Sequence, residues 1–458
     1  MRTPTRVLFY ADPPRLYESF ARSADVLANH LMDFVGSALL ASGRVEMKAV
    51  VSEIAAWQAR DDPRFAGIEL IPFSYDELGE VFAESRSLEA MMLRNFGRGF
   101  TDVELRRFRR VLSSRLGDWE PDVVICYPTN ASPFRTLYPE ALCLTGENGL
   151  FSRGPFPRSL RYDAIDFMNG FPNRFGGEIR RFAVSAEERG EIVRLREELN
   201  AILAAVNPQA KTLAAFREGY RQVVLVPVPA TNIYGEAAFD DQFLWLRDVL
   251  KHLPREIGVV ATFHDNVGAQ LSERTVAFLQ DRHPNLLAMG GSGWVYQSLW
   301  CFPYVDAVLN CESMTGLLGQ LMGTRLVALD RTYSAWAADG VGLGSLSDVL
   351  SAPPSDRAPS LAWLLTHYTV LERRFNDADW YFDFFERKLR HYRSSGIDFG
   401  LYERVERLDE VVDYLLKVVH MNIDQVQANL AAERRNHRKP SQKLGRWLVR
   451  QGNRLLET

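Results

Sequence analysis

Cysteine is scarce in this chain: four cysteines occur among 458 residues, and none shows the CxxC or Cys/His spacing of a zinc site. All of them lie in or beside apolar, strand-like segments, which favours buried free thiols. The even number still permits disulfides, but nothing at the N-terminus directs the chain to an oxidising compartment. The residues concerned are Cys126, Cys143, Cys301 and Cys311.

Long apolar runs and a strong excess of charge are also lacking. No apolar run approaches the ~20 residues that span a bilayer. The first run, RVLFYA, ends at Asp12 and is too short for a signal peptide. The net charge of −4 gives no overall attraction to nucleic acid. We therefore expect a protein that is cytoplasmic or peripheral to the inner membrane and has no nucleic-acid partner.

Apolar residues are plentiful, at 47% of the chain, and they occur in short runs separated by helix-length stretches. Strands that alternate with helices favour a parallel sheet covered by helices on both faces. The length exceeds the roughly 250 to 300 residues at which single cores stop growing, so we predict two α/β units in tandem. The candidate strands are RVLFYA, VEMKAVV, IELIPF, DVVICYP and EALCLTG in the first unit, and QVVLVPVP, IGVVATFH, LLAMGG, DAVLN and RLVALD in the second.

The predicted domain boundaries follow these two series of strands. The first Rossmann-like domain covers 1–210 and the second covers 221–358. The break lies near 207–220, where Pro208 follows a long helical segment. Residues 359–430 have a helical pattern and are expected to pack back across the domain pair.

Residues 431–458 form a basic amphipathic tail. Within 434–456, Leu444, Trp447 and Leu448 recur at helical spacing beside arginines. This pattern fits a helix that lies on an anionic membrane, which would be a peripheral contact. A solvated basic tail and a helix that binds another protein fit the same residues, so both alternatives stay open.

The segment VDAVLNCESMTGLLGQLMGTRLVALD reads as strand, polar turn, helix and second strand. Ser313 and Thr315 offer hydroxyl groups where the helix begins, and Glu312 and Gly316 stand beside them. Helix N-termini carry unpaired N–H donors and a partial positive charge, so they stabilise a bound phosphate. We therefore predict a site for a nucleotide-linked donor substrate here. The alternative is that Ser313 only caps a structural helix.

A second candidate for the donor site is His264, at the end of the strand IGVVATF and followed by Asp265 and Asn266. Parallel sheets place ligand groups at the ends of their strands. His264 would donate to a donor phosphate or carry a proton, and Asn266 would contact the donor beside it. The alternative is a histidine with a purely structural role.

The acidic candidate is Glu147, which follows the strand ALCLTG and stands between Gly146 and Gly149. Glycines permit a sharp backbone turn, which would present the carboxylate to the space between the two units. There it would act as base for an attacking hydroxyl or stabilise a developing cation. The alternative is an acid that caps the next turn or pairs with a nearby arginine. Asp163 and Asp166 are poorer candidates for the same role.

The order of these segments resembles a known family. An E-x-G motif with a following aromatic, Arg and Pro region, then VVLVPVP, then WLRDVLKHLPREIGVVATFH and then VDAVLNCESMTGLLGQLMGTRLVALD is similar to the capsule polysaccharide biosynthesis glycosyltransferases. That family includes transferases that use CMP-activated 3-deoxy-manno-octulosonic acid (Kdo). The resemblance covers 141–333. It implies a GT-B type fold, in which two Rossmann-like domains face a central cleft, with the acceptor on the first and the nucleotide-sugar on the second.

The resemblance also implies roles for single residues. Glu147 matches the acid of the family's Glu-x-Gly turn, and His264 matches the histidine of its His-Pro motif. Ser313 and Thr315 match the Ser-Thr turn before the donor-domain helix. Asn148 stands where some members of the family have an aspartate that serves the chemistry.

The function implied is transfer of a sugar, Kdo or a related acid sugar, from a CMP-linked donor to a surface polysaccharide or glycolipid. No metal or other cofactor is expected, because helix N-termini and basic groups can stabilise the departing phosphate. The acidic pair Asp240 and Asp241 opens a predicted helix, where acids need no metal to explain them. Two alternatives remain: a non-catalytic sugar-binding or assembly protein, which Asn148 keeps open, and a UDP-sugar enzyme such as an epimerase.

Overall fold

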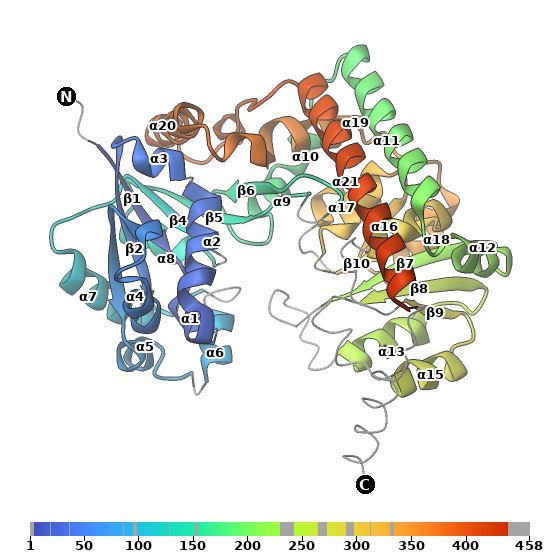
Figure 1. Ribbon diagram of the computed structural model, residues 1–458, viewed down its shortest axis with the longest axis horizontal. Coiled ribbons are helices and arrows are strands. Elements are labelled where there is room, and N and C mark those ends of the chain that lie inside the picture. Colours follow the sequence, from blue (N-terminus) through green and yellow to red (C-terminus); the bar gives the residue numbers. More distant parts are fainter. Residues whose placement is uncertain are drawn as a thin grey trace, which may run out of the picture.

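The chain forms two lobes, each built on its own β-sheet, with helices joining them along one side (Figure 1). This computed structural model describes residues 4–18, 20–35, 37–85, 87–94, 99–127, 129–151, 154–229, 242–263, 273–289, 297–311, 313–329 and 334–437.

The first sheet has seven strands in the order β13-β6-β5-β4-β1-β2-β3. The five strands from β3 to β5 are parallel, whereas β6 and β13 are added antiparallel at one edge. For the first six strands of the chain, this is the Rossmann order 3-2-1-4-5-6. The strands are β1 (Thr5–Tyr10), β2 (Val45–Ser52), β3 (Ile68–Phe73), β4 (Val123–Cys126), β5 (Leu142–Asn148), β6 (Ser159–Asp163) and β13 (Val370–Leu371).

The second sheet has six strands in the order β12-β11-β10-β7-β8-β9, with parallel pairing throughout. Numbered from β7, this is again the order 3-2-1-4-5-6. The prediction of two parallel α/β units is confirmed. The strands are β7 (Gln222–Val228), β8 (Ile257–Phe263), β9 (Leu286–Met289), β10 (Ala307–Asn310), β11 (Arg325–Ala328) and β12 (Gly340–Val341).

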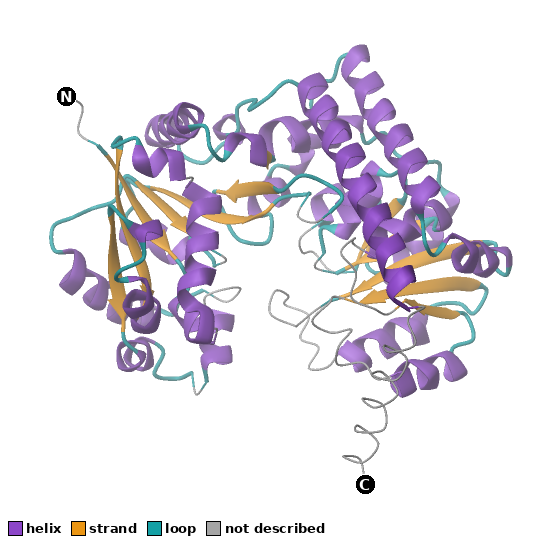
Figure 2. Ribbon diagram, viewed as in Figure 1, coloured by secondary structure: helices purple, strands orange, loops and turns teal. Residues whose placement is uncertain are grey.

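Helices pack against both sheets (Figure 2). In the first lobe they are α1 (Pro13–Glu18), α2 (Ser23–Val35), α3 (Ser37–Ala41), α4 (Glu53–Ala59), α5 (Tyr75–Val81), α6 (Leu88–Leu93), α7 (Asp102–Leu116) and α8 (Ser132–Leu137). In the second lobe they are α12 (Ala210–Glu218), α13 (Gln242–His252), α15 (Glu273–Arg282), α16 (Gln297–Cys301), α17 (Thr315–Leu321) and α18 (Leu346–Ser351). None of the helices in the described part of the chain is both long and apolar enough to cross a membrane.

The connecting segments are also helical. They comprise α9 (Gly170–Arg174), α10 (Gly176–Arg180), α11 (Ala186–Val206), α19 (Ala358–Trp363), α20 (Ala378–Ser395) and α21 (Leu408–His437). Helix α11 begins at a capping box, in which the Ser185 hydroxyl accepts from the backbone of Glu188 and the Glu188 carboxylate accepts from the backbone of Ser185. This reciprocal pair satisfies two N–H groups that the helix leaves open.

One hydrophobic core passes from the first lobe through the connecting helices into the second. In β7, Val223 and Leu225 face this shared core, whereas Val224 and Val226 face a separate cluster on the other side of the sheet. Successive side chains of a strand point to opposite faces, so a strand that is covered on both faces is apolar throughout. This is why strands such as β7 and β8 are visible in the sequence as apolar runs.

The C-terminal helices pack back across both lobes, as predicted. Arg194 of α11 forms an ion pair with Asp413 of α21 at 2.6 Å. Further along α21, Asn422 Nδ2 donates to the carbonyl oxygen of Pro155 in the first lobe at 2.8 Å. Helix α21 runs past the expected boundary at residue 430 to His437, and residues 438–458 of the predicted tail lie outside the described part of the chain.

The four cysteines are buried free thiols, as the sequence predicts. Burial raises the pKa of Cys143 and of Cys301 to about 12. At neutral pH these thiols are therefore protonated and poor nucleophiles.

Candidate functional site

The second sheet has a topological switch point between β7 and β10, where the strand order reverses. Open α/β sheets bind ligands outside the carboxyl ends of their strands at such points. Figure 1 shows that the carboxyl ends of the strands of this sheet face the first lobe. The turn that contains Ser313 and Thr315 follows β10 directly, so the structure brings these two predicted residues to the switch point.

The turn after β10 is held by a small network of hydrogen bonds. Ser313 Oγ accepts from the backbone N–H of Thr315 at 3.1 Å and donates to Thr315 Oγ1 at 2.8 Å. The fully buried Asn310 donates through Nδ2 to the carbonyl oxygen of Ser313 and to Ser334 Oγ, both at 2.8 Å. The alternative interpretation, a helix cap, does not describe Ser313, because Met314 holds the N-cap position of α17 and, among the described residues, no side-chain bond caps this helix. The network instead fixes the two hydroxyl groups in place.

Gly316 has a packing reason to be glycine. A Cβ at this position would lie 2.8 Å from Leu326 Cδ1 and 2.9 Å from Asn310 Cγ. The absence of a side chain therefore lets α17 approach β10 and β11 closely. Whether Gly316 also contacts a donor stays a prediction.

Three other predicted donor-site residues, His264, Asn266 and Glu312, lie outside the described residues. The same holds for the acidic pair Asp240 and Asp241. Within the part of the chain that the structure describes, no cluster of three or more His, Cys, Asp or Glu side chains could hold a metal ion.

Glu147 lies within strand β5, because the strand continues past Gly146 to Asn148. The expected sharp turn is wrong: Glu147 pairs across the antiparallel ladder with Arg161 of β6. Both glycines are required by close packing. A Cβ at Gly146 would lie 2.6 Å from the ring of Phe34, and one at Gly149 would lie 2.5 Å from a hydroxyl oxygen of β6.

The Glu147 carboxyl group is half-buried at this edge of the first lobe, and its Oε1 accepts from the backbone N–H of Asn148 at 2.7 Å. Burial raises the pKa of Glu147, and the positive charges of Arg161 and Arg15 and the Asn148 hydrogen bonds oppose the rise. A carboxyl group whose pKa is moved toward neutrality is a better proton acceptor and donor at physiological pH.

A basic and aromatic cluster surrounds the switch point of the first sheet, between β1 and β4. The ring of His30 lies 4.1 Å from the ring of Tyr127, and the guanidinium of Arg15 lies 6.0 Å from the same ring. Burial and the charges of Arg15 and Arg158 lower the pKa of His30 to about 3. His30 is therefore neutral at physiological pH. Arg15 acts electrostatically on both His30 and Glu147.

Sequence reasoning missed most of this cluster. Arg15 carries a weak signal, since it lies in the short helix that follows the first strand. Tyr127 likewise follows β4. His30 carries no such signal, because it lies inside α2.

Asp163, a poorer candidate for the acid, is fully buried at the end of β6. Its carboxylate accepts from the backbone N–H groups of Ile165 and Phe171, at 2.7 and 3.0 Å, and from the hydroxyl of Tyr368 at 2.5 Å. Burial and the nearby charge of Asp166 raise its pKa to about 6. These bonds anchor the loop that leads to α9, so the role of Asp163 is structural.

No family model and no curated protein sequence matches this chain. Among solved structures, it is similar to a β-Kdo 2,7 transferase, KpsC, of Thermosulfurimonas dismutans, with a TM-score of 0.36, 12% identity, and coverage of 71% of this chain and 92% of that one. It is also similar to an α,α-trehalose-phosphate synthase (UDP-forming) from Burkholderia vietnamiensis, with a TM-score of 0.41, 15% identity, and coverage of 87% and 100%.

A third similar structure is a UDP-GlcNAc 2-epimerase from Methanocaldococcus jannaschii in complex with UDP-GlcNAc and UDP, with a TM-score of 0.31, 10% identity, and coverage of 78% of this chain and 98% of that one. Identities and TM-scores this low carry no argument about activity. The class of fold follows from the chain's own two sheets: two Rossmann-like units in tandem with C-terminal helices packed back across them, the GT-B type of architecture. The resemblance to the capsule family stays a prediction.

Proposed function

We propose that this protein is a glycosyltransferase that takes a sugar from a nucleotide donor on the second sheet and transfers it to an acceptor on the first. One observation carries the proposal. Both sheets have the Rossmann strand order, and each has polar candidate residues at or beside its switch point. Such points are where sheets of this kind bind ligands.

The donor would be bound through its phosphate by the turn after β10. Helix α17 has only 7 residues, so its dipole alone does not make a phosphate site. The proposal relies instead on the hydroxyl groups of Ser313 and Thr315, which the surrounding hydrogen bonds fix before a ligand arrives. Fixed donors cost little reorganisation on binding. His264, Asn266 and Glu312 stay proposed members of this donor site, and CMP is the nucleotide that the sequence resemblance favours.

Glu147 would act as the base for the acceptor. The acceptor hydroxyl passes its proton to the Glu147 carboxylate, and its oxygen forms a bond to the anomeric carbon of the sugar. The bond from that carbon to the phosphate oxygen breaks, and the nucleotide leaves with the electron pair. Arg15 and Arg158 give this side of the site a positive potential, which favours an acceptor with negative charge such as an acidic polysaccharide or a glycolipid.

The location of the donor site can be tested with the double substitution Ser313→Ala and Thr315→Val. Each lost hydrogen bond to a charged phosphate is worth about 1.5 to 3 kcal/mol, so CMP should bind at least ~10-fold more weakly than to the wild type. Calorimetric titration gives both affinities. Ser394→Ala, an exposed position on α20, is the matched control and should bind CMP like the wild type. Equal affinities of the double variant and the wild type would contradict this location.

A further inference from the structure

A cavity of about 260 Å³ lies in the second lobe, at the amino ends of β11 and β12. The turn with Ser313 and Thr315 follows the carboxyl end of β10, so the cavity and the proposed donor site lie at opposite ends of α17. Three parts of the chain meet around it: the connecting helix α10, the edge of the second sheet, and the segment that leads into α19. The polar residues that line it include Arg180, Gln320, Arg325, Asp339, Ser355 and Arg357.

The two acidic side chains at this cavity already have partners. Asp339 Oδ2 accepts from Arg357 Nη2 at 2.8 Å and from the backbone N–H of Leu326 at 2.7 Å. Asp356 forms an ion pair at 2.7 Å with Arg189, which stands outside the lining.

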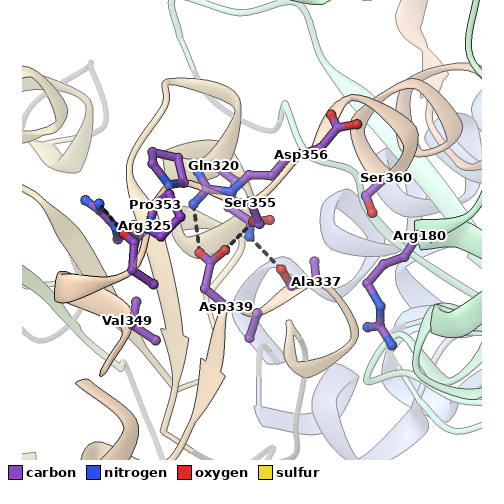
Figure 3. A pocket seen from close by; sticks show the side chains of 14 residues that line it. Arg180, Gln320, Arg325, Ala337, Asp339, Val349, Pro353, Ser355, Asp356 and Ser360 are labelled. Carbon is purple, nitrogen blue, oxygen red and sulfur yellow. Dashed lines mark hydrogen bonds and ion pairs between the residues drawn. The ribbon is translucent and has the colours of Figure 1, made fainter. Parts of the chain in front are cut away.

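The arginines outnumber these acids. Arg180, Arg325 and Arg357 line the cavity, and Arg189 pairs with Asp356 from outside the lining. These four positive charges exceed the two negative charges of Asp339 and Asp356. The cavity therefore has a positive potential. Figure 3 shows Arg325 and Arg180 on opposite sides of the hollow, with Asp339 between them.

Two of the arginines keep an unused donor. Arg357 is 8% exposed, and its Nε atom and that of Arg325 are buried without a hydrogen-bond partner in the described part of the chain. Their other bonds go to backbone oxygens and to Asp339: Arg325 Nη2 donates to the carbonyl oxygen of Ala352 at 2.9 Å. These Nε atoms have almost no accessible surface, so a ligand in the cavity does not reach them. Arg180, Arg325 and Arg357 line the cavity, and their guanidinium groups are the donors that an oxyanion prefers.

We propose that this cavity is a second ligand site, separate from the transfer site, that binds a phosphate group, either free or as the monoester of a small sugar. The phosphate accepts from guanidinium N–H groups of Arg180, Arg325 and Arg357, which line the cavity. Because Arg180 comes from α10 and donates to the carbonyl oxygen of Trp336 in the second lobe, the bound phosphate strengthens the junction between the connecting segment and the second sheet.

Thermal unfolding of the full chain tests this site, with sodium phosphate, glucose 6-phosphate and sodium chloride compared at equal ionic strength. Phosphate, glucose 6-phosphate or both should raise the unfolding temperature of the wild type above the chloride value, and calorimetric titration should show saturable binding. Arg180→Gln and Arg325→Gln should each weaken the binding at least ~10-fold, as expected for a charged contact. Arg357 is not replaced, because it also donates to Asp339 and to the carbonyl oxygen of Thr324. Its loss would disturb the fold.

Two controls separate this site from others. Arg247→Gln, an exposed position on α13, should bind phosphate like the wild type. The Ser313→Ala, Thr315→Val variant should also keep phosphate binding, which distinguishes the cavity from the proposed donor site. A response to glucose 6-phosphate alone would identify a monoester as the ligand. No stabilisation beyond chloride, or equal binding by Arg180→Gln, Arg325→Gln and the wild type, would overturn the proposal.

Discussion

Replacing Glu147 with glutamine should lower the rate of sugar transfer by roughly 10²- to 10⁴-fold, the range of a positioned proton acceptor, while CMP binding stays unchanged. Glutamine keeps the size of the side chain and can still accept from the backbone N–H of Asn148, but it cannot take a proton. The turn with Ser313 and Thr315, the proposed donor site, lies in the other lobe, so its affinity for CMP should not change.

The dependence of the transfer rate on pH gives a second test of this prediction. A base must be deprotonated to act, so the wild-type rate should rise with pH through the pKa of Glu147, which burial holds above the ordinary value for glutamate. The variant should lose this acidic limb. Glu218→Gln, at the exposed end of α12, is the matched control. Wild-type turnover by Glu147→Gln at every pH would remove Glu147 from the mechanism.

Asp163→Asn should have the largest effect on stability. An asparagine amide would turn an N–H group toward the hydroxyl of Tyr368, which now donates to the carboxylate, while the amide oxygen can still accept from the backbone N–H of Phe171. A buried donor left without an acceptor costs about 1 to 3 kcal/mol, so the free energy of unfolding should fall by that amount. Urea unfolding measures this loss. An equal substitution at the exposed Asp61 should leave stability nearly unchanged.

The loss at Asp163 should depend on pH. Burial raises the pKa of this group from its usual 3.8 to about 6, so the native state binds the proton more tightly than the unfolded chain between these values. The stabilisation from this proton is fully present below pH 3.8 and is lost as the pH rises through 6. The asparagine variant has no such proton, so the gap between the two proteins should be wider at pH 5 than at pH 7.5. A gap that widens with pH would contradict the buried carboxyl group described here.

The sheets could be predicted from the sequence because their strands are buried on both faces and read as short apolar runs. Strands β6 and β13 could not. In β6 the fully buried Arg161 interrupts any apolar pattern, and the 2 residues of β13 pair only because the C-terminal segment folds back onto the first sheet. Both depend on partners that are distant in the sequence.

The candidate site was predictable in the same limited way. Ser313 and Thr315 follow a strand directly, so their place at the carboxyl edge of a sheet can be read from local order. The role of Gly146 cannot, because the ring of Phe34 that requires a glycine there comes from another element. His30 and Tyr127 likewise come into contact only when α2 packs beside β4, and their spacing in the sequence does not predict that contact.

The claim that this protein uses a nucleotide-sugar donor is tested most directly by calorimetric titration of the wild-type chain with CMP, UDP, GDP and ADP under identical conditions. The proposal predicts saturable binding at one donor site per chain, tightest for CMP and weakened by the Ser313→Ala, Thr315→Val substitutions. Tightest binding of UDP would move the activity to a UDP-sugar. Absence of binding by all of these nucleotides would contradict the proposed glycosyltransferase.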